Sequence, residues 1–131
     1  MLFRSMKQFQ SLSESEMEVM RVIWASPTPV TSAEMLERFS AKGWKIQTVS
    51  TFLTRLVDKG ALKTEKRGRG NLYSPALTPA EYRRREARNV VDTMYGGSVL
   101  DFMAAFYGGN HADERELDEL RNWFEREMDK R

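Results

Sequence analysis

Residues 44–73 carry the side chains whose types and spacing best suit a chemical task. A row of mostly amide and hydroxyl side chains comes first, and it comprises Gln47, Thr48, Ser50, Thr51, Thr54 and Arg55. A cluster of cations follows, which comprises Lys63, Lys66, Arg67 and Arg69. Cations bind phosphates, whereas short hydrogen-bonding side chains can reach the edges of bases. Together the two groups predict a surface that binds double-stranded DNA.

The two groups have different expected roles. The first four residues of the first group lie in the first turns of a predicted helix, the part of a recognition helix that meets base edges. The last two lie farther along and are expected to touch the DNA backbone. The four cations of the second group are expected to neutralise phosphates, and Arg69 could instead enter a narrow minor groove. The alternative for each residue is a solvated surface position without a ligand.

The net charge of +2 conceals an asymmetry along the chain. Residues 1–77 carry twelve Lys or Arg against seven Asp or Glu, whereas residues 78–131 carry nine against twelve. Between residues 40 and 77 the two counts are eight and two. A positive charge concentrated in this way favours a polyanionic partner for the N-terminal part alone, although an ordinary basic surface would give the same counts.

Hydrophobic periodicity predicts the elements that position these side chains. Helices are expected over 14–25, 32–41 and 46–59, followed by strands over 61–66 and 72–76 that form a hairpin. In the third helix a core stripe is formed by Ile46, Val49, Leu53 and Leu56, and Gly60 is placed to end the helix in the left-handed conformation. Three helices followed by a hairpin form a winged helix-turn-helix.

Capping boxes of the form Ser/Thr-x-x-Glu mark three expected helix starts, at Ser13, Thr31 and Thr78. The last one opens a region with helices expected over 79–95, 98–106 and 113–129. The first of these helices is expected to bury Ala87, Val90, Val91 and Met94. The next two carry apolar rows of Val99, Phe102, Met103 and Phe106, then of Leu117, Leu120, Phe124 and Met128. About fifty residues seldom bury enough apolar surface alone, so these rows predict homodimerisation.

The predicted fold class is α+β and mostly helical. Residues 1–77 are expected to form a winged helix-turn-helix DNA-binding domain, in which residues 1–10 are disordered. Residues 78–131 are expected to form a helical dimerisation region.

Several classes of protein are not supported by the composition. The chain has no Cys, and its one His, His111, lies beside a Gly pair in a predicted exposed loop. No phosphate-binding loop, metal cluster or nucleophile–base pair can be assembled, so neither an enzyme nor a cofactor or metal site is expected. No apolar run is long enough to cross a membrane, and the first ten residues lack the apolar core of a signal peptide. A cytoplasmic protein is therefore expected.

An ordered set of residues runs along nearly the whole chain, from about residue 12 to 129. It comprises Leu12-Ser13, Glu16, Glu18-Val19-Met20, Ile23-Trp24, Trp44, Thr48-Val49, Thr51, Leu53-Thr54-Arg55-Leu56, Lys59-Gly60, Leu72-Tyr73-Ser74-Pro75 and Tyr95-Gly96-Gly97-Ser98. In this set the chain resembles the penicillinase repressor family, which includes the BlaI, MecI and CopY types. The resemblance implies a winged-helix dimer with intertwined C-terminal helices that binds a palindromic operator as a transcriptional repressor.

Members of that family respond to β-lactam antibiotics through a membrane sensor, or to copper. The chain lacks the Cys cluster of the copper-responsive branch, so the resemblance does not extend to copper sensing. At the Asn-Phe bond where the antibiotic-responsive branch is cleaved, the nearest alignment gives Ala104-Ala105, which leaves that mechanism open. Gln47 and Ser50 stand where basic residues are common on the family's recognition helix, so the family's operator sequence cannot be transferred.

The expected function is that of a homodimeric, sequence-specific transcriptional regulator, a repressor bound to a palindromic double-stranded DNA operator. The alternative is a winged-helix module that binds another protein and no longer reads DNA, although such a module would have little reason to keep a basic wing. Structured RNA is a weaker alternative, because side chains cannot read the deep A-form major groove.

Overall fold

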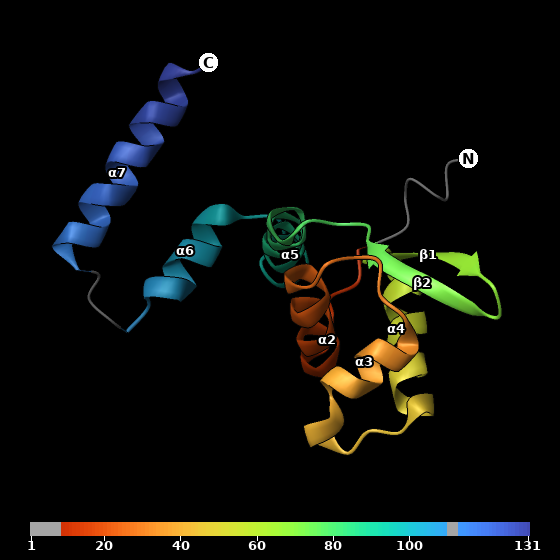
Figure 1. Ribbon diagram of the computed structural model, residues 1–131. Coiled ribbons are helices and arrows are strands. Elements are labelled where there is room, and N and C mark those ends of the chain that lie inside the picture. The colour runs from red at the N-terminus through yellow and green to blue at the C-terminus, as the bar shows by residue number, and fades with distance from the viewer. Residues whose placement is uncertain (1–8, 110–112) are drawn as a thin grey trace. The chain divides into compact units, whose positions relative to one another are not determined.

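The computed structural model describes residues 9–109 and 113–131 (Figure 1). Its elements, in chain order, are α2 (Glu14–Ala25), α3 (Ser32–Arg38), the 3₁₀ turn η1 (Ser40–Lys42), α4 (Ile46–Asp58), β1 (Leu62–Arg67), β2 (Gly70–Pro75), α5 (Pro79–Met94), α6 (Val99–Tyr107) and α7 (Glu114–Asp129). The chain divides into two units at Asn89, inside α5. None of the described helices is both long and apolar enough to cross a membrane.

The three predicted capping boxes are confirmed. At the start of α2, the Ser13 hydroxyl accepts a hydrogen bond from the Glu16 N–H at 3.2 Å, and the Glu16 carboxylate accepts one from the Ser13 N–H at 2.8 Å. The same reciprocal pair of bonds opens α3 at Thr31 and α5 at Thr78. Each box satisfies backbone donors that the first helical turn would otherwise leave unpaired.

The core of the first unit lies between α2, α3, α4 and the hairpin. Met20 and Ile23 of α2 and Leu53 and Leu56 of α4 are fully buried in it. The prediction that Ile46 belongs to this core is wrong, since Ile46 is 41% exposed. Ile46 is the first residue of α4, and the buried part of its stripe begins one turn later.

The second helix is shorter than predicted. It ends at Arg38, and the turn η1 replaces the rest of the expected helix over 32–41. Phe39, between the two, is buried and stacks on Trp44 with ring centroids 4.8 Å apart. The turn ends at Gly43, whose φ of +72° is left-handed, and Gly60 ends α4 in the same way with a φ of +81°.

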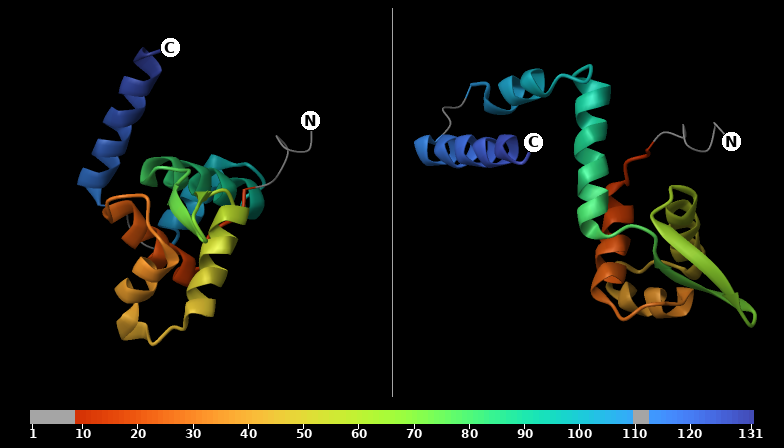
Figure 2. Two further views of the ribbon diagram at one scale, coloured as in Figure 1. Left: turned by 45° about the vertical axis from the view of Figure 1, so that its right-hand side comes forward. Right: turned by 90° about the horizontal axis from the view of Figure 1, so that it is seen from above.

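The hairpin has a shorter loop than predicted. Arg67 pairs with Gly70, so only Gly68 and Arg69 form the loop, and Gly68 has a φ of +61°. Val30, in the loop before α3, adds a bridge that the sequence did not suggest. The Val30 N–H donates to the Tyr73 carbonyl at 2.9 Å, and the Tyr73 N–H donates to the Val30 carbonyl at 2.8 Å. The bridge ties the base of the hairpin to the helices, while its tip extends past them (Figure 2).

The second unit leaves many of its large apolar side chains exposed. Neither α6 nor α7 contains a buried residue. Aromatic contacts along this part of the chain include Tyr95 with Phe102, 5.6 Å between ring centroids, and Phe102 with Phe106, 6.0 Å. The prediction that helix 79–95 buries Ala87 and Met94 is wrong, because both side chains are exposed. Helical periodicity identified the apolar row, but many of its side chains are exposed in the described part of the chain.

Candidate nucleic-acid interface

The exposed face of α4 carries most of the predicted recognition residues. Gln47, Thr51, Thr54 and Arg55 are exposed, at spacings of four, three and one residues. Residues at such spacings share one side of a helix, so their side chains form a single row opposite the buried stripe. Of the other predicted residues, Thr48 and Ser50 are half-buried and lie at the edges of this row. We call the four exposed residues the α4 row.

The start of α4 differs from the starts of the other described α-helices. Its N-cap residue is Lys45, and no side chain caps the first turn. Side-chain oxygens cap the others, from Ser13, Thr31, Thr78, Ser98 and Asp113. The first backbone N–H groups of α4 are therefore available to another acceptor. Phosphate is a good acceptor at such a place, because the helix dipole also favours a negative charge there.

Thr51 has a particular orientation within the row. Its hydroxyl donates a hydrogen bond to the carbonyl of Gln47, 2.9 Å away on the preceding turn. With that proton engaged, Thr51 offers an approaching base its methyl group and an acceptor oxygen. A Thr methyl can contact the methyl group of thymine.

The predicted cations of the hairpin do not all lie on one side. Lys63 and Arg67 are four residues apart on β1, so they share a face, whereas Lys66 lies on the other. Arg69 occupies the second position of the loop. All four side chains are exposed. One duplex can therefore meet the face with Lys63 and Arg67, or the face with Lys66, with Arg69 at the tip in either case.

Arg67 lines a groove of about 370 Å³ together with residues of α3. It lies between the start of α3 and the hairpin and is lined by Thr31, Ser32, Ala33, Arg67, Gly70, Asn71 and Leu72. Ser32 and Asn71 add hydrogen-bonding groups beside the guanidinium, as a phosphate contact would require. Sequence reasoning missed these two residues, because no local pattern places α3 next to the hairpin.

An ion pair with a buried carboxylate anchors the other end of α4. The Lys59 ammonium lies 2.7 Å from a Glu16 carboxylate oxygen, and the Glu16 side chain is 2% exposed. Burial raises the pKa of the Glu16 carboxyl, but the hydrogen bonds from Lys59 and Ser13 and the positive charge of Lys59 outweigh it. The pKa of Glu16 therefore lies below its ordinary value, and Glu16 is ionised at neutral pH.

The residues predicted for dimerisation differ in exposure. Val91 is buried, and Val90, Phe102, Met103 and Leu120 are half-buried. The exposed members are Met94, Val99, Phe106, Leu117 and Phe124. Met128, the last residue of the predicted apolar row of α7, is exposed as well. Leu100 and Trp123 are also exposed, and the prediction left these two out. The pair Ala104-Ala105 is exposed and lies inside α6.

Nothing in the described part of the chain forms a group of three or more His, Cys, Asp or Glu side chains that could hold a metal ion. The predicted loop residue His111 lies outside the described residues.

Comparison with other proteins relates this geometry to known molecules. A protein-family model described as penicillinase repressor matches residues 12–126. The penicillinase repressor of Bacillus licheniformis is 30% identical over 115 residues, which cover 88% of this chain and 90% of that protein. The methicillin resistance regulatory protein MecI of Staphylococcus aureus (strain N315) is 25% identical over 111 residues, covering 85% and 90% respectively.

A solved structure is also similar. The solution structure of the DNA-binding domain of the repressor BlaI matches with a TM-score of 0.51 and 35% sequence identity, over 58% of this chain and 93% of that one. The match confirms the predicted α+β fold with a winged helix-turn-helix.

Proposed function

Because this chain belongs to the penicillinase repressor family, we propose that it is a transcriptional repressor that binds double-stranded operator DNA as a homodimer. The observation that carries the proposal is the exposed α4 row beside a basic hairpin, on a fold shared with the DNA-binding domain of BlaI. Residues 1–77 would read the operator and residues 78–131 would join the two copies. Binding to operator DNA also accounts for a cytoplasmic location.

In this proposal α4 enters the major groove and the hairpin follows the backbone. The α4 row supplies an amide, two hydroxyls and one guanidinium, which can reach base edges or the neighbouring phosphates. The uncapped first turn of α4 and the guanidinium of Arg67 can bind phosphates on either side of the groove. In a dimer, two such surfaces require half-sites separated by about one helical turn or a multiple of it.

The apolar side chains of the second unit support dimerisation. Phe106 is 62% exposed and Phe124 is 49% exposed. Monomeric proteins seldom expose many large apolar side chains close together, whereas a second copy could cover them symmetrically.

DNA binding is tested by fluorescence anisotropy with the full chain. The probe is the duplex from upstream of this protein's own gene, compared with a shuffled duplex over a salt series. We expect tighter binding to the native duplex, with log K falling linearly as log salt rises, because phosphate contacts release counterions. Equal and weak binding to both duplexes would favour a protein-binding module instead.

Dimerisation is tested separately by light scattering coupled to size-exclusion chromatography. We expect Phe106→Asp with Phe124→Asp to give a monomer, since each change places a charge in an apolar contact. Asn122→Asp, on the exposed polar side of α7, is the control and should leave the dimer intact. A double variant that still runs as a dimer would move the interface elsewhere.

A further inference from the structure

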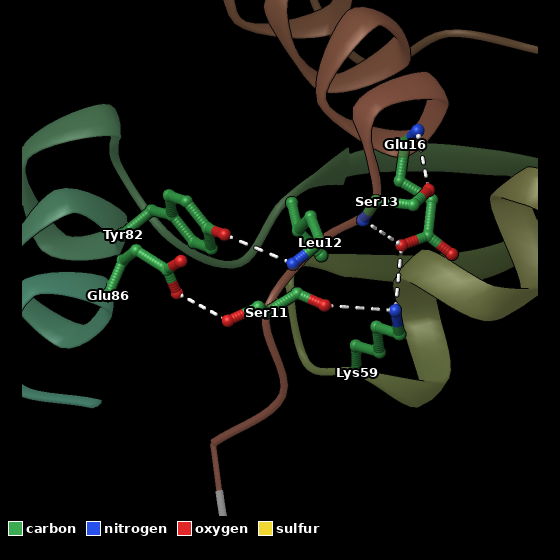
Figure 3. A network of polar contacts seen from close by, with 7 residues as sticks. All are labelled: Ser11, Leu12, Ser13, Glu16, Lys59, Tyr82 and Glu86. Atoms are coloured by element: carbon green, nitrogen blue, oxygen red, sulfur yellow. Dashed lines mark hydrogen bonds and ion pairs between the residues drawn. The ribbon is translucent and has the colours of Figure 1, made fainter. Parts of the chain in front are cut away.

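The short segment Ser11–Ser13, just before α2, contacts two elements that lie far from it in the sequence. Its hydrogen bonds run to the end of α4 on one side and to the first turns of α5 on the other (Figure 3). We call this segment the strap. Its partners on α5 are Tyr82, Glu86 and Asn89, and all three lie in the first unit, so the whole network belongs to that unit.

On the α4 side, Lys59 is the central residue of the network. It is the C-cap residue of α4, and its ammonium group donates to the Ser11 carbonyl at 3.1 Å and to the Glu16 carboxylate at 2.7 Å. The same Glu16 oxygen accepts from the Ser13 N–H at 2.8 Å. The strap, the start of α2 and the end of α4 are therefore held by a single buried carboxylate.

On the α5 side, the strap makes two close hydrogen bonds. The Leu12 N–H donates to the Tyr82 hydroxyl at 3.1 Å, and the Ser11 hydroxyl donates to a Glu86 carboxylate oxygen at 2.6 Å. Tyr82 is 6% exposed, and its ring packs against Trp24 of α2 and Phe9 before the strap, with centroid distances of 6.4 and 5.5 Å. Tyr82 and Glu86 are one helical turn apart on α5, so the two bonds fix the direction of the helix axis as well as one point of contact.

We propose that the strap is a positioning element that sets the direction in which α5 leaves the winged helix relative to α4. The proposal rests on the proposed function, because its consequence appears only when two copies bind one operator. α5 continues without a break from Pro79 to Met94, into the region proposed to dimerise. Its direction would therefore determine how far apart, and at what angle, the two α4 helices lie.

The sensitivity of this arrangement follows from the length of α5. Tyr82 and Met94 are twelve positions apart, which is about 18 Å at the rise of an α-helix. A tilt of about 10° at Tyr82 would displace the far end by about 3 Å. Successive base pairs are about 3.4 Å apart, so this displacement nearly equals a change of one base pair in half-site spacing. Loss of the hydrogen bonds at the strap should therefore let α5 tilt, and the protein should then distinguish less sharply between operators with different half-site spacings.

The test uses the full chain and a duplex that the wild-type protein itself selects from a random-sequence pool. Two derived probes accompany it: the same duplex with one half-site scrambled, and a set with one base pair added or removed between the half-sites. Ser11→Ala with Tyr82→Phe removes both close bonds to α5 but keeps the tyrosine ring. Ser40→Ala, which removes a hydroxyl from η1 outside the strap, serves as the control.

We expect the strap variant to bind the selected duplex about tenfold more weakly, and to lose most of the wild-type preference for the selected spacing. Its affinity for the single half-site duplex should stay within about twofold of wild type, which also shows that the variant is folded. The control variant should match wild type on all probes. An unchanged spacing preference would overturn the proposal, and so would an equal loss of affinity for the single half-site.

Failure of the underlying function would look different. In that case the wild-type chain would select no particular duplex, and the result would not depend on any strap variant. Both proposals would then be wrong. A wild type that discriminates spacings, with a strap variant that discriminates equally well, would contradict the strap proposal alone.

Discussion

Helices α4 and α7 have similar amphipathic sequences, but the apolar face of α4 is buried and that of α7 is exposed. On α4, Val49, Leu53 and Leu56 are at most 2% exposed, and the polar row faces outward. On α7, the corresponding apolar row remains open, with Leu117 44% and Phe124 49% exposed. Both sequences predict one apolar face at helical spacing.

The difference lies in what the rest of the chain provides. α4 is surrounded by α2, α3 and the hairpin, which fill its apolar face with side chains from three directions. For α7 the described residues provide no comparable packing. An apolar stripe therefore shows that a helix has a face to bury, but it does not identify the partner. Changes on the two helices should accordingly have different consequences, which the following predictions use.

The largest effect is expected in the core of the first unit. Leu53→Ala should lower the free energy of unfolding by about 2–5 kcal/mol, the usual cost of removing a fully buried leucine side chain. The cost should not depend on protein concentration. Leu117→Ala should cost little in dilute solution and more as concentration rises, because the proposed dimerisation would stabilise the folded state by mass action. Chemical denaturation of both variants at several concentrations would check this, and a large, concentration-independent cost for Leu117→Ala would contradict it.

A smaller effect is expected on the exposed polar faces of the same two helices. Gln47→Ala should reduce the preference for the selected duplex by about 1–3 kcal/mol, as expected for the loss of one base contact. Asn122→Ala, which removes an exposed amide from α7, should leave DNA binding unchanged. Competition anisotropy with single-base variants of the duplex measures both.

The hairpin should act on affinity rather than on preference. Arg67→Ala should weaken binding to all sequences alike and reduce the slope of log K against log salt by about one, since one phosphate contact is lost. The same salt series measured with a shuffled duplex provides the comparison. A change confined to the selected sequence would indicate that Arg67 reads bases.

The smallest difference is expected in acid sensitivity. The pKa of Glu16 is lowered in the folded chain, so the unfolded carboxyl binds a proton more readily. The stabilisation it provides is complete above the ordinary glutamate pKa and is lost as pH falls through the lowered one. Stability should therefore fall less steeply with acidification in Glu16→Gln than in wild type. Thermal unfolding of the variant and the wild type at a series of pH values would measure the difference, and equal slopes for the two would contradict the prediction.

Much of the fold could be predicted because the signals that start and end helices are local. The capping residue Ser13 and its partner Glu16 are three positions apart, and the same holds at Thr31 and Thr78. Gly60 ends α4 because the backbone there takes the left-handed conformation, which glycine adopts readily since it has no Cβ. These features depend on neighbours within one turn and could therefore be identified in the sequence.

The site could be predicted in part. Spacing identified the α4 row and the basic hairpin, but strand alternation separates Lys66 from Lys63 and Arg67. The contribution of Ser32 and Asn71 beside Arg67 depends on α3 lying against the hairpin. Ile46 lies on the same helical stripe as Val49, but the core does not extend to it, so its side chain is exposed. In each case the sequence does not show which part of the fold lies next to the side chain.

The sequence by itself determined the order of the elements, the three capping boxes, the glycine stops and the apolar stripe of each helix. Tertiary structure alone decided that Val30 would pair with Tyr73, that Lys59 would meet a buried Glu16, and that the strap would hold Tyr82 across seventy residues of chain. The first set of features arises from hydrogen bonds and spacings within about four residues, so it depends only on neighbours in the sequence. The second set requires distant segments to meet, and their positions depend on the packing of the whole unit.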